Sequence, residues 1–428
     1  MKISSTFFIK ILLITEIILI LLSPKALKIL IGYEGIYPNP QFLFFLLIAP
    51  LLLYFNVFDF SSLRKFYDIL LVIMLIVSIY FLSAFISLIN LYVDPYYPIS
   101  ESFRQFLNYF IIFFIFLFLR SEYLIFSLKF IVFYGLFNFL FVVYGILVYF
   151  QILEAPNFLS DTIIKSINNQ SWTAFGFIPK WGGFFPETQI LSTYYLICYI
   201  SIDLLETKIG KRKVYTLYKY LFGMLILLLM SKSTTPAFLF YLFFKKLNIS
   251  SFKRRFVYFL LTLAIIISYI IITIENEIYS LFDNSLEELA LKYSSIGERI
   301  FHIVKSFEYM SDNIIGFFFG LGPRTYGSLV SSEYPQYFNE YTNAISVFNI
   351  LSDIGIVGFS SFLLFLYIVF MKIKDNVLKV SYIAVLLAYT PQVAWGDSFI
   401  YLFLSFLINY SYSFKFTNYE AILRRPVL

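Results

Sequence analysis

The chain has 428 residues and a formal net charge of +6 at pH 7, but only 14% of its residues are charged and 60% are hydrophobic. A soluble domain carries about 25% charged residues, so this composition excludes an ordinary soluble protein and indicates an integral membrane protein. We therefore expect the net charge to reflect membrane topology, and we do not expect nucleic acid as a partner.

The apolar runs are close to the roughly 20 residues that a membrane-spanning helix needs, and they are continuous rather than alternating. A helix satisfies its own backbone groups in lipid, so the sequence predicts an all-α polytopic membrane protein with one integral membrane domain over residues 1–428. About twelve transmembrane helices are expected, at 6–23, 41–57, 68–91, 103–119, 123–151, 186–205, 214–230, 234–247, 256–274, 345–371, 380–395 and 398–414.

The distribution of lysine and arginine tests this count. With the N-terminus placed in the cytoplasm, most of the 32 lysines and arginines fall on the cytoplasmic side, largely in short loops. The positive-inside rule weighs short loops most, so we expect a multi-pass protein of the cytoplasmic (inner) membrane with both termini cytoplasmic. Acidic residues instead concentrate in the interval 275–344, which this topology places outside.

Two external loops exceed the length of a turn. The loop 152–185 is rich in glycine and aromatic residues, including Trp172 and Trp181, and these aromatics suit a membrane interface. The loop 275–344 is the longest polar interval of the chain, and loops of that length are usually functional or disordered. Its many large apolar residues argue against disorder, so we expect it to contain short amphipathic helices and a functional site.

One such helix is predicted over 298–310. Its apolar residues follow the i, i+3, i+4, i+7 spacing of one helix face: Ile300, Ile303, Val304 and Phe307. That face would rest in lipid or on the bundle, while Glu298, His302 and Lys305 would lie over the entrance. Arg299, beside the only histidine of the chain, makes the polar face a candidate for binding an anion. A structural interfacial helix with solvated charges accounts for the pattern equally well.

A glycine-rich turn, Gly320-Leu321-Gly322-Pro323-Arg324, follows in the same loop. Exposed backbone N–H groups beside a guanidinium can hold a phosphate or a diphosphate. A plain turn is the alternative, because two glycines separated by one residue are a weak signal. The anion interpretation gains weight from Arg299, which precedes the turn in the same loop.

Glu187 follows Pro186 at the point where the loop 152–185 enters an apolar run. Proline suits the first turn of a helix, and a carboxylate there is favoured by the helix dipole. That capping role is sufficient by itself. The functional interpretation is a carboxylate at the membrane face that accepts a proton from a substrate hydroxyl.

Lys232 lies between two apolar runs in the segment Ser231-Lys232-Ser233. A lone cation at that depth is a site candidate by default, and a lysine snorkelling from a tight turn is the alternative. Among the polar residues inside predicted spans, Asp353 is the most suggestive, because glycines at 355 and 358 permit tight packing after it. Most such residues are expected to hydrogen-bond between helices.

Several kinds of chemistry find no support in the sequence. One histidine and one cysteine cannot form a zinc site, so neither a metal nor another cofactor is expected. There is no Walker motif, serine-hydrolase elbow or dinucleotide fingerprint, which excludes a pump driven by its own ATP hydrolysis.

Four segments, in their order along the chain, resemble the motifs of the bacterial O-antigen polymerase and O-antigen ligase superfamily. Together they cover roughly residues 180–370, and Lys232 keeps the charge of the family's usual arginine without its bidentate fork. The segments are Gly183-Phe184-Phe185-Pro186-Glu187-Thr188, Ser231-Lys232-Ser233, Gly297-Glu298-Arg299 with His302 and the later Gly320-Leu321-Gly322 before Tyr326, and Ile350-Leu351-Ser352-Asp353-Ile354-Gly355-Ile356-Val357-Gly358.

The resemblance implies an enzyme that transfers glycans from undecaprenyl diphosphate outside the cytoplasmic membrane of a bacterium. Arg299, Arg324 and Lys232 would offset the charge on the diphosphate, with the turn at Gly320 and Gly322 beside them. The general base would be Glu187 or His302, with Arg299 also in the catalytic set. Trp172, Trp181 and Tyr326 would stack on sugar rings. The implied partners are the lipid-linked oligosaccharide, membrane lipid, a chain-length regulator and a flippase.

One departure separates two activities of the superfamily. Its ligases carry a histidine about eleven residues before the glycine that Gly355 matches, whereas this chain has Ala344 there. This favours a polymerase that joins repeat units into O-antigen, capsule or exopolysaccharide. The alternatives are a ligase that transfers finished glycan to a lipid or protein, and a flippase for lipid-linked oligosaccharide.

Overall fold

The protein is almost entirely helical. The computed structural model describes residues 5–21, 40–89, 96–156, 163–164, 181–185, 188–231, 233–246, 296–312, 314–335, 338, 347–389 and 398–414. Within these residues the only extended pairing is an isolated bridge between Phe58 and Leu119. The predicted all-α class is therefore confirmed for the part of the chain that is described.

The helices follow the predicted apolar runs. Every predicted span overlaps a helix except 256–274, which lies outside the described residues. The helices at these runs are α1 (Ser5–Leu21), α3 (Pro40–Tyr54), α4 (Tyr67–Ile89) preceded by the 3-10 helix η1 (Phe60–Phe66), α5 (Tyr96–Phe106) continued by the π-helix η2 (Leu107–Ile115), α6 (Ser121–Tyr149), α8 (Thr188–Ile209), α9 (Lys213–Leu229), α10 (Thr234–Lys246), α16 (Val347–Lys372), α17 (Asn376–Tyr389) and α18 (Ser398–Ser413).

Four helical segments of the described chain are long and apolar enough to cross a membrane. Large apolar side chains stand exposed along several helices, for example Phe85 on α4, Leu140 on α6 and Met224 on α9. Soluble monomers rarely expose extended apolar surfaces, so these flanks fit contact with lipid tails. The four segments are Phe60–Ile89, Ser121–Tyr149, Thr188–Ile209 and Phe348–Lys372.

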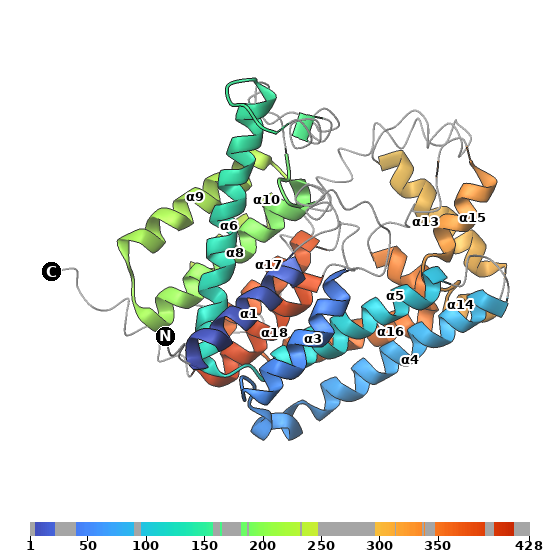
Figure 1. Ribbon diagram of the computed structural model, residues 1–428. Helices are drawn as coiled ribbons and strands as arrows, with labels where there is room; N and C mark the ends of the chain where they lie inside the picture. Colours follow the sequence, from blue (N-terminus) through green and yellow to red (C-terminus); the bar gives the residue numbers. More distant parts are fainter. Residues whose placement is uncertain are drawn as a thin grey trace.

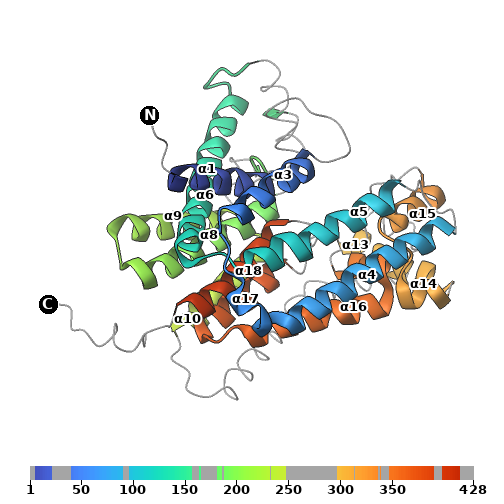
Figure 2. The same ribbon diagram turned by 60° about the horizontal axis from the view of Figure 1, so that its bottom comes forward.

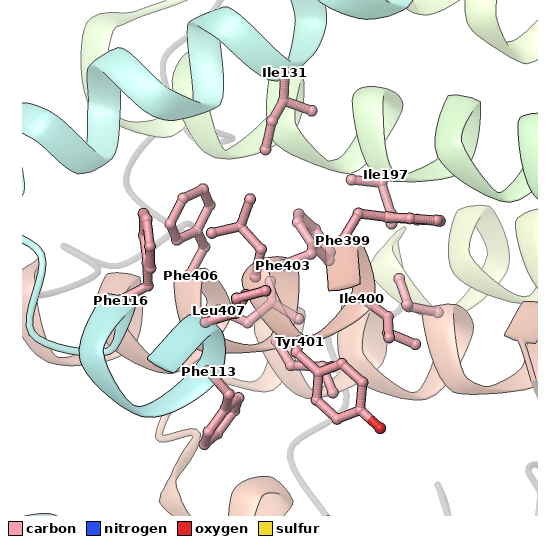
Figure 3. Close-up of a cluster of buried hydrophobic side chains, with 14 of the residues drawn as sticks. Phe113, Phe116, Ile131, Ile197, Phe399, Ile400, Tyr401, Phe403, Phe406 and Leu407 are labelled. Atoms are coloured by element: carbon pink, nitrogen blue, oxygen red, sulfur yellow. The ribbon is translucent and has the colours of Figure 1, made fainter. Parts of the chain in front are cut away.

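The core is organised around α18, which is buried on all sides from Phe399 to Ser411. A helix that is hydrophobic all round belongs in the interior of a bundle. Figure 3 shows its side chains Phe403 and Phe406 reaching toward Ile131 of α6, with Phe113 of η2 on the other side. Helix α18 thus connects the early helices of the chain to the middle ones.

Three short helices close one end of the bundle formed by α4, α5 and α16 (Figures 1 and 2). They are α13 (Ile296–Ser311), α14 (Ile314–Phe319) and α15 (Thr325–Glu333), and we call them the cap. All three pack against α16, and α14 also packs against α4. An aromatic cluster that includes Phe301, Tyr326 and Tyr334 holds α13 to α15.

The predicted helix 298–310 lies within α13, but its two faces are used differently from the expectation. His302 and Lys305 of the polar face are buried inside the cap, whereas Val304 and Phe307 of the apolar face are exposed. The polar face therefore does not line an open entrance. Its groups find partners on α15, while the exposed apolar face suits lipid, one of the two surroundings that the sequence allowed.

Candidate functional site

The main concentration of charge near the cap is centred on Glu101 of α5, a carboxylate that the sequence analysis did not single out. Glu101 is only 5% exposed. Its Oε1 atom accepts hydrogen bonds from Nε of Arg104 at 3.0 Å and from Nε2 of Gln105 at 3.0 Å. Its Oε2 atom lies 3.6 Å from Nε of Arg324. Two arginines that are distant in sequence therefore converge on the two oxygens of one carboxylate.

A glycine turn brings Arg324 to this position. Gly320 and Gly322 have φ angles of 87° and 104°, and Arg324 itself is left-handed at 67° where it begins α15. Left-handed backbone suits glycine and costs other residues free energy. A Cβ atom on Gly320 would lie 2.2 Å from the backbone oxygen of Asp353, so the turn also needs glycine for close approach to α16.

The turn docks where α16 is broken. Gly355 has φ 65° and ψ −172°, which interrupts the helix. Leu321 N–H donates to the Ser352 carbonyl at 2.8 Å and Gly322 N–H to the Asp353 carbonyl at 3.2 Å. Broken helices inside membrane bundles commonly line binding sites, because their freed backbone groups need partners. Here the turn supplies those partners.

This docking changes the expected role of the glycines. The N–H group of Gly320 donates to the Gly316 carbonyl at 2.7 Å, and that of Gly322 to Asp353. The backbone donors expected to cradle a phosphate are thus engaged within the protein. The direct anion contact falls instead to the side chain of Arg324, which the turn positions.

Asp353 completes the group of charges. Its side chain is buried and interacts electrostatically with Glu101, Arg324 and Arg104. Its backbone oxygen also accepts a hydrogen bond from Ser83 of α4. We call Glu101, Arg104, Arg324 and Asp353 the arginine cluster.

The two cations of the arginine cluster reach the surface, whereas its two acidic side chains are buried. The side chain of Arg104 is 30% exposed and that of Arg324 is 24% exposed, whereas the carboxylate of Glu101 is covered. Guanidinium groups bind phosphate through parallel hydrogen bonds, so the exposed sides of this pair suit a phosphoryl anion.

Neutral hydrogen bonds brace the cluster. Asn108 donates to Gln105 at 3.4 Å, and Ser398 of α18 donates to Asn108 at 2.8 Å. On the other side, the hydroxyls of Ser87 and Thr325 lie 2.7 Å apart, which links α4 to the first turn of α15. These contacts connect Glu101 and Arg324 to different parts of the bundle.

His302 lies inside the cap. It is 2% exposed, and its Nδ1 atom is 2.7 Å from the hydroxyl of Tyr326. Phe301 and Phe338 pack against the ring. A general base needs an accessible nitrogen, so this position does not support the expected role of His302 as the base. The contact with Tyr326 instead fastens α13 to α15.

Two of the expected sugar-stacking rings are also enclosed. Tyr326 and Trp181 are each 1% exposed. Trp181 lies directly over Gly145, where a Cβ atom would be 1.9 Å from the indole ring, and packs with Ile163. Stacking on a sugar needs an open ring face, and neither ring presents one in this structure. Their packing roles follow from the same large apolar surface that suggested stacking.

Other predicted site residues lie where the structure gives no side-chain geometry. Arg299 is on α13, but its side chain lies outside the described part of the chain. Glu187, Lys232 and Trp172 also lie outside the described residues. Their predicted roles remain predictions.

A second set of charged groups stabilises the cap. Nζ of Lys305 lies 2.7 Å from Glu333 and 3.1 Å from Glu308, and the Tyr309 hydroxyl donates to Glu333. Burial would raise the pKa of Glu333, but the hydrogen bonds from Lys305, Tyr309 and Tyr334 outweigh it and lower that pKa. These groups join the last turns of α13 and α15.

Glu101 and Arg104 carried a signal that the sequence analysis passed over. They are three residues apart at the start of a predicted span, where an acid and a base can pair on one helix face. Arg104 lies inside the predicted span 103–119, and an ionisable residue within a span is a functional candidate by default. Their meeting with Arg324 depends on the glycine turn and the break in α16, which no local pattern encodes.

The comparisons with known proteins assign no family. The sequence matches no protein-family model, and no curated protein matches it. Among the described residues, no three or more histidine, cysteine, aspartate or glutamate side chains gather as a metal site.

Proposed function

We propose that this protein is a polymerase that joins oligosaccharide repeat units carried on undecaprenyl diphosphate into a surface polysaccharide. In this proposal about twelve helices cross the cytoplasmic membrane of a bacterium, both termini are cytoplasmic, and the cap faces outward. Four apolar helices of spanning length and the uneven distribution of lysine and arginine support that topology.

The observation that carries the proposal is the convergence of Arg104 and Arg324 at the end of the bundle closed by the cap. A diphosphate leaving group gains negative charge as its bond to the sugar breaks. Preorganised cations directed at that charge stabilise the transition state more than the ground state. Two guanidinium groups held on a buried carboxylate supply this without a metal ion.

The reaction is a substitution at the anomeric carbon of the growing chain. A hydroxyl oxygen of the acceptor repeat unit forms the new bond, and the bond from the anomeric carbon to the diphosphate oxygen breaks. The hydroxyl proton passes to a carboxylate, for which Glu187 is the candidate once His302 is enclosed. Undecaprenyl diphosphate leaves with the electron pair, and its lipid tail stays in the bilayer.

Deletion of the gene tests the proposed activity. A polymerase deletion should leave surface glycan as single repeat units, seen as loss of the ladder of long chains on a gel. Persistence of long chains attached to the cell surface would refute the proposal. Long chains that accumulate unattached on undecaprenyl diphosphate would indicate the ligase, and lipid-linked units trapped on the cytoplasmic face would indicate the flippase.

Arg299→Ala tests whether the predicted arginine of α13 serves the same site. We expect shortened chains at normal protein abundance, because one cation is removed from the diphosphate. Arg64→Ala is the matched control, since Arg64 is exposed at the start of the helical segment that contains α4. Full chain length in the Arg299 variant would remove Arg299 from the site.

A further inference from the structure

We propose that Glu101 is a positioning residue that fixes Arg104 and Arg324 as a single two-guanidinium receptor for a phosphoryl anion. This rests on the proposed function for the identity of the ligand, a lipid-linked diphosphate. It adds Arg104 to the binding residues and gives the buried carboxylate a role. Neither residue belongs to the motifs that suggested the family.

The two arginines reach Glu101 from different parts of the chain. Arg104 lies three residues away on α5 and donates to Oε1, whereas Arg324 follows the glycine turn and approaches Oε2. The carboxylate therefore fixes the separation of two groups that lie far apart along the chain. Arginine side chains lose much rotamer freedom when ordered, so a receptor that is ordered before the anion arrives binds it more tightly.

Glu101 is itself held in place. Gln105 donates to the same oxygen as Arg104, and Asn108 and Ser398 extend this chain of hydrogen bonds into α18. A largely buried network of this kind favours one geometry, because each broken hydrogen bond would leave a buried polar group unsatisfied. The network thus connects the orientation of Arg104 to the first residue of α18.

The sign of the expected effect separates positioning from simple charge balance. A carboxylate repels an anion, so removal of a mere counter-charge should tighten anion binding. Removal of a positioning carboxylate should weaken binding even though the local charge becomes more positive. The two roles predict opposite changes in the same dissociation constant.

The test uses the purified full-length protein in detergent, with inorganic pyrophosphate as the probe and the ligand-dependent rise in melting temperature as the readout. We expect Glu101→Ala to raise the apparent Kd for pyrophosphate about tenfold, since the arginines lose their common partner. Glu101→Gln should have a smaller effect, because its amide oxygen still accepts from Arg104. Unchanged or tighter binding in the alanine variant would overturn the proposal.

Two controls separate positioning from general loss of stability. Glu206→Gln removes a carboxylate from an ion pair with Lys219 elsewhere in the bundle and should leave the Kd unchanged. In an Arg104→Gln/Arg324→Gln background, Glu101→Ala should have no further effect, because it acts only through the arginines. A full tenfold effect in that background would refute positioning. Glu101→Gln keeps the size of the side chain, so the test survives if the alanine variant does not fold.

The source of the anion is tested in a parallel titration with phosphatidylglycerol. A diphosphate site should respond to pyrophosphate with a Glu101-dependent shift that phosphatidylglycerol does not reproduce. A Glu101-dependent shift with phosphatidylglycerol and none with pyrophosphate would overturn the diphosphate assignment. The polymerase proposal is tested by a different experiment, the deletion strain. Long glycan chains in that strain would refute the polymerase without affecting the measured anion binding.

Discussion

Two ionic clusters of this protein contain the same number of acidic and basic side chains but differ in how the basic side chains are held. The lysine cluster, like the arginine cluster, holds two acidic and two basic side chains: Asp203, Glu206, Lys219 and Lys245. Nζ of Lys219 lies 2.7 Å from Asp203 and also contacts Glu206, while Lys245 contacts Asp203. Tyr241 donates to the same aspartate at 2.7 Å. The three helices that supply these groups, α8, α9 and α10, follow one another along the chain.

The difference lies in one loosely held cation, Arg324, and in the exposure of the basic side chains, since Arg104 bonds to Glu101 as directly as the lysines do to their carboxylates. In the lysine cluster both lysines contact carboxylates directly, and their side chains are only 19% and 15% exposed. In the arginine cluster Arg324 stays 3.6 Å from Glu101, and both guanidinium groups are more exposed. A closed ion pair holds helices together, whereas a cation held at a distance with an exposed side can also meet a ligand. We therefore expect the first cluster to contribute to stability, and the second is the one we propose as a binding site.

Arg324→Ala should produce the largest effect on function. Loss of one preorganised donor to a developing charge typically lowers a rate by about 10²–10³-fold. Long-chain glycan per molecule of protein should fall accordingly, while the melting temperature changes little, since Arg104 still pairs with Glu101. A glycan gel normalised to protein abundance measures the first, and thermal unfolding measures the second. Wild-type chain length in the Arg324→Ala variant would show that the arginine cluster is not needed for activity.

Asp203→Asn should have the opposite profile. It leaves two lysines close together with one fewer carboxylate, and breaking a buried pair of this kind costs about 3 kcal/mol. We expect lower protein abundance and a lower melting temperature, with unchanged glycan length per folded molecule. Glu122→Gln, at an exposed carboxylate on α6, is the control for loss of one negative charge. Shortened glycan without loss of stability would show that the lysine cluster contributes to activity.

Gly320→Ala tests whether the turn that carries Arg324 needs its close contact with α16. The left-handed backbone alone costs a non-glycine residue roughly 1–2 kcal/mol. Gly210→Ala is a matched control, because Gly210 has a φ of 92° and nothing within 4 Å of an added Cβ atom. Both variants should lose similar backbone stability. Only Gly320→Ala should also shorten the glycan, because its Cβ atom would displace the turn from Asp353; equal effects would show that the close contact is dispensable.

These comparisons show which parts of the molecule the sequence makes predictable. The all-α class and the positions of the helices follow from apolar runs of spanning length, because lipid requires each helix to satisfy its own backbone. Gly320 and Gly322 predict the glycine turn. Arg324 lies at its end and is therefore predicted to bind an anion. The membrane topology and the external position of the cap remain predictions.

Burial and pairing were not predictable from local patterns. The sequence predicts functional roles for His302 and Tyr326, yet in the structure these side chains contact each other inside the cap. Sequence spacing gave the two faces of α13 correctly but not which face would turn inward, because that depends on the partners on α15. The proposed role of Glu101 depends on its contact with Arg324, which lies more than two hundred residues later in the chain. No local pattern around Glu101 predicts that contact.

The smallest expected effect is on stability, at Glu333, an exposed carboxylate in the cap that belongs to neither ionic cluster. The pKa of Glu333 is lowered from its ordinary 4.5, because hydrogen bonds to its charged form outweigh its partial burial. A group with a lowered folded-state pKa stabilises the fold above its unfolded pKa, and this contribution is lost as the pH falls below that value. The side chain is 41% exposed, so solvent screening keeps the contribution below about 1 kcal/mol. The melting temperature of Glu333→Gln should lie slightly below that of the wild type at pH 7, and the difference should shrink as the pH falls below 4.5, the ordinary pKa of the group. Glu308→Gln removes a more exposed partner of the same lysine and should shift the melting temperature less. A difference for Glu333→Gln that grows on acidification would show that the carboxylate is not held in its charged form.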